Sequence, residues 1–238
     1  MRRRVGEAMG VAVCLAVVLA GCADSGDSGE AGKAQAGKGE HAGSTSYQIS
    51  DRVMSLDLEG GGGDVTLTAG TGPITVTERM EYLGRIPVTS HSVVNGTLRL
   101  TTDRCSAVGV CKVSYTITAP AAVAANLVSK GGAISVSGMS GAVAVKADGG
   151  RVILDRISAP TVTVNTGGGP ADVTMSAMPR SVSVRTRGGE LTMALPGGPY
   201  AVTAKSAGGR KEIGVTTAAT GAKVDVSTAG GKTTIKQA

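Results

Sequence analysis

Residues 143–154 read VAVKADGGRVIL, and this stretch decides the fold. Apolar residues alternate with small or polar ones on both sides of Gly149-Gly150, as they do in a β-strand with one buried face. A glycine pair between two such runs suits a tight corner, where positive φ is expected and no Cβ fits. The stretch therefore predicts two short strands joined at a glycine corner.

The same pattern recurs along the chain. An early copy surrounds Gly62-Gly63, and the intervals between the later Gly-Gly pairs are 18, 19, 20, 20 and 22 residues. These later pairs begin at Gly131, Gly149, Gly168, Gly188, Gly208 and Gly230. Self-similarity at a fixed period near 20 residues is typical of stacked coils. We therefore predict an all-β fold, a single-chain parallel β-solenoid (β-helix) over residues 47–238, in which each copy pairs with its neighbours in the sequence.

The N-terminus has the features of an export signal. Arginines occupy positions 2–4, an apolar run from Met9 to Ala20 follows, and the stretch ends in Leu19-Ala-Gly-Cys22. The run is too short to span a bilayer as a helix. Small residues directly before a cysteine resemble a bacterial lipobox, which implies a signal peptide at 1–21 and a diacylglycerol on Cys22. An ordinary signal peptide is the alternative.

Residues 22–46 follow as a predicted disordered tether, because after Cys22 they contain no apolar residue larger than Ala. His41 falls within this stretch and is expected to be solvated. We expect a protein on the outer face of the cytoplasmic membrane, held there by its lipid anchor.

Residues 81–119 interrupt the repeats and are predicted to be a hairpin elaboration of the solenoid. Asn95-Gly96 between two alternating runs is a strong hairpin signal. With Cys14 removed in the signal peptide and Cys22 lipidated, Cys105 and Cys111 are the remaining cysteines, and an exported protein should oxidise them to a disulfide. A metal site is the alternative, although there is no second cysteine pair to support it.

The composition limits the classes of function. The chain has 238 residues with no Phe, no Trp and four Tyr, and its formal net charge is +6. Nucleic-acid binding favours basic clusters interleaved with stacking aromatic residues, so no nucleic-acid partner is expected. The sequence also has no evident nucleophile–base pair or metal-ligand cluster. We expect no cofactor and no enzymatic activity.

The repeats resemble those of a bacterial family known as putative adhesins, and the likeness covers about residues 47–238. Members show the same V-x-V, Gly-Gly, V-x-V rhythm and are often exported or membrane-tethered. The segment with Cys105 and Cys111 is similar to that of actinobacterial lipoprotein members. The resemblance implies surface adhesion and transfers no site residues.

One candidate site emerges when the copies are stacked. Three residues before successive Gly-Gly pairs stand Lys146, Asn165, Arg185, Lys205 and Ser227, which should form a ladder on one strand face. A solvated basic face is the simpler interpretation. The functional one is a groove in which Lys146, Arg185 and Lys205 bind an anionic envelope polymer. The favoured function is an adhesin-like or envelope-binding module, with an anionic polymer or a surface protein as partner. The alternatives are a polysaccharide-acting β-helix enzyme and a self-assembling envelope scaffold.

Overall fold

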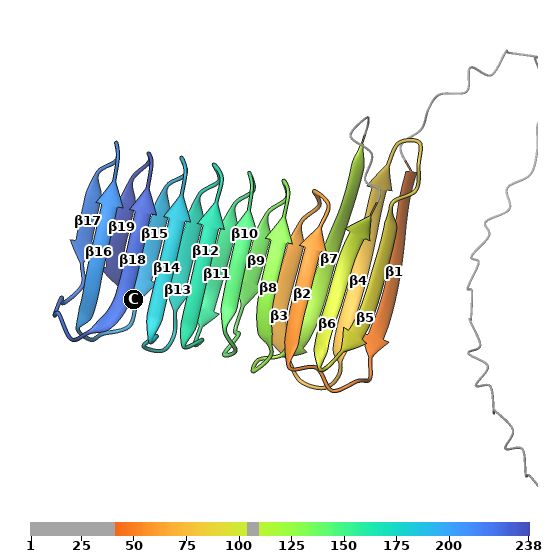
Figure 1. Ribbon diagram of the computed structural model, residues 1–238, viewed down its shortest axis with the longest axis horizontal. Coiled ribbons are helices and arrows are strands. Elements are labelled where there is room, and N and C mark those ends of the chain that lie inside the picture. Colours follow the sequence, from red (N-terminus) through yellow and green to blue (C-terminus); the bar gives the residue numbers. More distant parts are fainter. Residues whose placement is uncertain (1–40, 104–109) are drawn as a thin grey trace, which may run out of the picture. The chain divides into compact units, whose positions relative to one another are not determined.

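The computed structural model describes residues 41–103 and 110–238. The secondary-structure elements of these residues are all β-strands. The strands of this part of the chain form two mixed sheets, one of ten strands and one of nine (Figure 1). The all-β prediction is confirmed. The described residues include no helix with the length and apolar character to cross a membrane.

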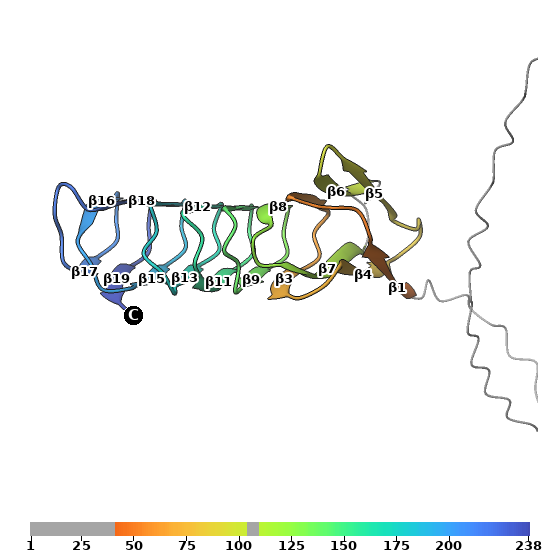
Figure 2. The ribbon, with the colours of Figure 1, turned by 90° about the horizontal axis from the view of Figure 1, so that it is seen from below.

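The repeats place one strand in each of two facing sheets (Figure 2). In the middle of the chain, the nine-stranded sheet takes the strands before the glycine pairs: β8 (Ala124–Ser129), β10 (Val143–Ala147), β12 (Thr161–Thr166) and β14 (Ser181–Thr186). The ten-stranded sheet takes the strands after them: β9 (Ile134–Ser137), β11 (Val152–Ile157), β13 (Ala171–Met175) and β15 (Leu191–Leu195). Neighbours in each sheet pair in parallel here, so that Val145 lies between Leu127 and Val164.

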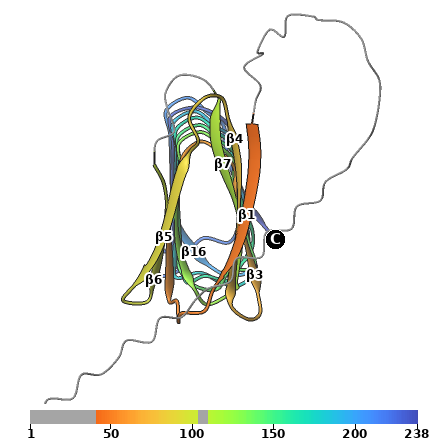
Figure 3. The ribbon, with the colours of Figure 1, turned by 90° about the vertical axis from the view of Figure 1, so that its right-hand side faces the viewer.

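The core is the narrow layer between the sheets. Viewed from the end that contains β1, the strands of each sheet lie one behind another (Figure 3). The predicted inward residues fill the layer: Val143, Val145, Val152 and Leu154 each expose at most 2% of their surface. Because these side chains come from alternate positions of short strands, the core consists of repeated aliphatic layers, and it needs no Phe or Trp.

The second glycine of most corners is required by backbone packing. A Cβ on Gly150 would lie 2.0 Å from the carbonyl oxygen of Gly132, whereas a Cβ on Gly149 would meet nothing within 4 Å. The expected positive φ occurs in these pairs only at Gly62 and Gly231. Close approach of stacked backbones, more than left-handed geometry, therefore explains the glycine pairs.

Side-chain hydroxyls close four of the corners. The hydroxyl two residues before the glycine pair donates to the carbonyl oxygen of the second glycine, over 2.9–3.2 Å. The donors are Ser129, Thr166, Thr186 and Ser206. Each bond satisfies a carbonyl at a turn, where the sheet ladder supplies no partner.

The last two repeats depart from chain order. Their strands are β16 (Tyr200–Ser206), β17 (Lys211–Gly214), β18 (Ala222–Thr228) and β19 (Thr233–Gln237). β18 lies between β14 and β16, and β19 lies between β15 and β17, in parallel throughout. The prediction that each copy pairs with its sequence neighbours is wrong here. The exchange buries Val224 and Val226 fully and leaves the less bulky pair, Val202 and Ala204, at the edge.

The other end of the stack shows a similar exchange. β2 (Ser55–Gly60) and β3 (Val65–Gly70) lie between β8/β9 on one side and β6 (Thr97–Asp103) and β7 (Cys111–Pro120) on the other. The segment 81–119 is thus more than an elaboration, because β6 and β7 form a full layer of the core. Leu98 and Leu100 align with Leu56 and Leu58 and are equally buried.

Antiparallel strands complete this end, so a purely parallel fold is not what forms. β1 (His41–Ile49) and β4 (Ile74–Tyr82) are antiparallel, as are β4 and β7. β5 (Val88–Val94) and β6 form the hairpin at Asn95-Gly96, where both residues have positive φ. A two-residue turn can join only antiparallel neighbours, which explains the change of direction at this hairpin.

The first strand begins at His41, inside the stretch predicted as tether. The ring of His41 stacks on Tyr82 with centroids 5.4 Å apart, so it is not simply a solvated linker residue. The predictions for the signal peptide, Cys22 and residues 22–40 lie outside the described residues. Cys105 also lies outside them, whereas Cys111 begins β7.

A buried carboxylate links the two sheets at the end that contains β1. Glu78 on β4 is 3% exposed and accepts hydrogen bonds of 2.6 Å from the hydroxyls of Tyr47 on β1 and Thr89 on β5. The Tyr47 ring stacks on His91 with centroids 4.3 Å apart. Burial, followed by the bond to Glu78, raises the pKa of Tyr47. This cluster covers the core at the end of the stack that contains β1.

Candidate functional site: a basic groove

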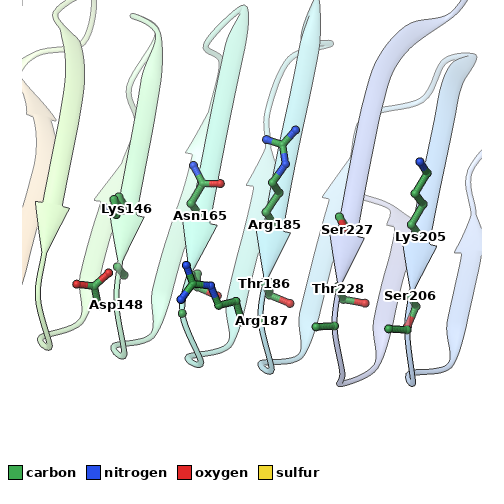
Figure 4. Close-up of a pocket in the computed structure, with 15 residues that line it drawn as sticks. Lys146, Asp148, Asn165, Arg185, Thr186, Arg187, Lys205, Ser206, Ser227 and Thr228 are labelled. Carbon is green, nitrogen blue, oxygen red and sulfur yellow. The ribbon is translucent and has the colours of Figure 1, made fainter.

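The predicted ladder residues lie in one row across the nine-stranded sheet. The strand registers align Lys146 with Asn165, Asn165 with Arg185, Arg185 with Ser227, and Ser227 with Lys205 (Figure 4). All five occupy outward positions, because their neighbours along each strand are buried or partly buried inward residues. The order of the last two differs from the chain order because β18 is inserted between β14 and β16.

A groove of about 590 Å³ runs beside this row, at the carboxyl ends of the strands. Its walls include the row itself, Arg187 and Asp148. Gly167, Ala207 and Ala229, which carry little or no side chain, also line it. A second hollow, of about 390 Å³, adjoins it and adds the carboxylate of Asp225.

The groove is positively charged. Lys146, Arg185, Arg187 and Lys205 line it, against the single carboxylate of Asp148. Among the described residues, the ion pairs within 4.0 Å all involve other cations. Arg185 donates a hydrogen bond of 3.1 Å to the hydroxyl of Ser183, which directs its guanidinium along the strand. Cations without carboxylate partners attract an anion most strongly when they share one concave surface.

The groove can bind through charge and hydrogen bonds. Thr166 and Thr186 are not free donors, because both already donate to glycine carbonyls. Outside the groove, His91 stacks on Tyr47 and His41 on Tyr82. Within residues 41–103 and 110–238, no three His, Cys, Asp or Glu side chains gather as metal ligands would.

Sequence reasoning did not include Arg187 in the site. It stands two residues beyond Arg185, directly after the last residue of β14, and it joins the groove because the strand carboxyl ends meet there. The signal was present as Arg185-Thr-Arg187 directly before a glycine pair. Asp148, which the sequence analysis did not include in the site, lines the same groove.

No family model matches the sequence, and no curated protein matches it closely enough to be counted as a relative. Several solved structures are similar. A structure named as a putative cell adhesion protein from Clostridium sporogenes is 12% identical, with a TM-score of 0.49 over 83% of this chain and 100% of the other. One named as a putative adhesin from Bacteroides fragilis is 17% identical, with a TM-score of 0.48 over 84% and 99%. One named as a putative lipid binding protein from Parabacteroides distasonis is 13% identical, with a TM-score of 0.36 over 82% and 97%.

Proposed function

We propose that this chain is a lipid-anchored, non-enzymatic binding module of the bacterial envelope, built on a β-solenoid. Its basic groove binds an anionic envelope polymer. The observation that carries the proposal is the row of Lys146, Arg185 and Lys205, exposed along one groove and without an ion-pair partner in the part of the chain that the structure describes. The groove holds four cations and the carboxylate of Asp148, and the adjoining hollow adds Asp225. The excess of positive charge favours binding of a polyanion, and the small number of carboxylates favours binding over turnover.

The anchor belongs to the same proposal. Cys22 carries diacylglycerol after the signal peptide is removed, and two or more acyl chains at about 0.8 kcal/mol per buried methylene hold a protein stably at a membrane. Labelling cells that express the chain with a palmitate analogue tests this. We expect a labelled protein in the membrane fraction, and loss of both label and membrane association in Cys22→Ser. Equal labelling of the two forms would contradict the anchor.

Binding is tested with the soluble chain from Ala23 to Ala238. Purified envelope fractions rich in anionic polymer should retain it at low salt and release it at high salt, because exposed charge pairs are screened. A variant with Lys146, Arg185 and Lys205 all changed to Glu should lose retention. The matched control changes three exposed cations outside the groove, Arg52, Arg85 and Lys112, to Glu and should keep most of it.

Equal losses in the triple variant and its control would show that net charge alone is responsible, and the groove would be rejected as the site. The polysaccharide-acting alternative is tested in the same incubation. Release of oligosaccharides from the envelope fraction by the wild-type chain would replace binding with turnover as the function.

A further inference from the structure

The cations of the groove occupy every second strand of the row. Lys146 lies on β10, Arg185 on β14 and Lys205 on β16, while the strands between them carry Asn165 and Ser227. The row therefore reads cation, neutral polar, cation, neutral polar, cation (Figure 4). In chain order Arg185 and Lys205 would be adjacent, and only the insertion of β18 separates them.

The regular alternation sets a charge spacing. Neighbouring strands lie about 4.8 Å apart, so successive cations of the row are roughly 10 Å apart at their backbones. A single anion cannot span all three. A chain lying across the strands, with one negative charge per two strand spacings, can place a charge at each cation.

The neutral residues between the cations further restrict the class of polymer that matches the row. The Asn165 amide both donates and accepts hydrogen bonds, and so does the Ser227 hydroxyl. Both suit hydroxyl or amide groups better than a second anion. A polymer that bears a charge on every sugar, such as polygalacturonate, would place half of its charges opposite these neutral groups. A polymer that alternates charged and uncharged units would satisfy both kinds of residue.

We propose that the groove binds a linear acidic polysaccharide with one carboxylate per disaccharide. It lies across β10, β12, β14, β18 and β16, with a carboxylate at each of Lys146, Arg185 and Lys205 and the uncharged sugars at Asn165 and Ser227. This inference rests on the proposed function and specifies its ligand. Arg187 and Asp148, on the adjacent side of the groove, contact the edge of the same sugar chain.

The test measures binding of the chain from Ala23 to Ala238 by calorimetry at low salt. The probes are oligosaccharides of alternating glucuronate and N-acetylglucosamine, with oligogalacturonate, polyphosphate and neutral dextran as comparisons. We expect the alternating hexasaccharide, with three carboxylates, to bind best per carboxylate. The tetrasaccharide should bind roughly fivefold more weakly, the size expected when one exposed ion pair is lost.

Two variants distinguish recognition of the alternating charges in the row from electrostatic attraction by net charge alone. Asn165→Lys and Ser227→Lys together fill the neutral positions and should shift the preference to oligogalacturonate, which has a carboxylate on every sugar. A control variant, Asn126→Lys with Thr163→Lys, adds the same charge on the same sheet outside this row and should leave the preference unchanged.

The outcomes separate this inference from the proposed function. If polyphosphate or oligogalacturonate binds the wild-type chain as tightly per charge as the alternating sugar, the groove takes polyanions without regard to spacing, and only the inference fails. If no polyanion binds, both fail. If the control variant shifts the preference as the Asn165 and Ser227 variant does, the alternation in the row is not what selects the ligand, and the inference is overturned.

Discussion

The second glycine of a corner has no space for a side chain, and its neighbour has ample space. A Cβ at Gly150 would overlap the backbone of Gly132, while Gly149 faces open space with no positive φ to strain a substitution. The same contrast recurs at Gly168-Gly169 and Gly188-Gly189. The two glycines of a pair therefore have different roles: packing requires a glycine at the second position and leaves space for a side chain at the first.

Gly150→Ala should be strongly destabilising and Gly149→Ala nearly neutral. Forcing a methyl group against a backbone carbonyl costs at least about 2 kcal/mol, since the stacked corners on both sides prevent relaxation. An exposed substitution without a clash stays within about 0.5 kcal/mol. Urea unfolding of the two variants checks this, and similar midpoints for both would show that the corners are not closely packed in solution.

Ala147 takes the place of the hydroxyl residue that closes four other corners. Ala147 holds the position before Gly149-Gly150, it is 1% exposed, and its register neighbours Ser129 and Thr166 both donate to glycine carbonyls. Ala147→Ser should donate to the carbonyl oxygen of Gly150 and stabilise the protein by about 0.5–1.5 kcal/mol. Ala144→Ser, on the outward face of the same strand, is the control and should be neutral. Thermal unfolding measures both, and a loss of stability in Ala147→Ser would show that the corner has no room for the hydroxyl.

At this scale the sequence predicted most of what is buried. Alternation identified Val143, Val145, Val152 and Leu154 correctly because burial in a strand follows the period of the chain. The role of the glycines was not predictable, because it depends on how closely one copy approaches the next. A Ser or Thr two residues before most of the glycine pairs was a readable signal that the periodicity of apolar residues alone does not reveal.

At the scale of strands, the outer strands of the two sheets determine whether another chain can add to a sheet edge. β16 and β17 are the outer strands at one end, and Ile213 on β17 is 45% exposed. Lys211 reaches across this end and donates to the carbonyl oxygen of Ala204 on β16, over 3.2 Å. A lysine on an open edge opposes strand addition, because pairing would bury its ammonium.

Lys211→Thr should therefore promote self-association through the open edge. The change removes the charge, frees the Ala204 carbonyl and raises β-propensity at the same time. We expect the wild-type chain to sediment as a monomer and the variant to form dimers or larger species as concentration rises. Lys236→Thr, on the interior strand β19, is the matched control and should stay monomeric. Concentration-dependent assembly of the wild-type chain would instead support the scaffold alternative.

At the scale of the whole molecule, the order of the repeats in space differs from their order in the chain at both ends. β2/β3 lies inside β6/β7, and β18/β19 lies inside β16/β17. A repeat pattern predicts that copies stack, but which copies become neighbours depends on the long connections and on which copy is apolar enough for an interior position. The same limit applied to the groove: Lys146, Arg185 and Lys205 were predictable from their offsets, whereas the place of Ser227 between Arg185 and Lys205 was not.

The insertion of the last repeat predicts an unusual response to truncation. Ending the chain at Gly221 removes β18 and β19, which lie between β14/β15 and β16/β17. The buried side chains of Val224, Val226 and Ile235 are lost, each worth about 1.5–3 kcal/mol, and β16 and β17 lose their strand partners. We expect a large drop in the unfolding midpoint and rapid proteolysis of the region from β16 onward.

The matched deletion removes a layer of similar size from the physical end of the stack, by replacing residues 196–221 with the connection 176–180. Because β18 and β19 then follow β15 directly and keep their pairing with β14 and β15, this variant loses buried Tyr200 but should still unfold cooperatively, at a higher midpoint than the truncated chain. If the truncated chain proved the more stable of the two, the last repeat would lie at the end of the stack in solution, and the spacing of the cations in the groove would have to be revised with it.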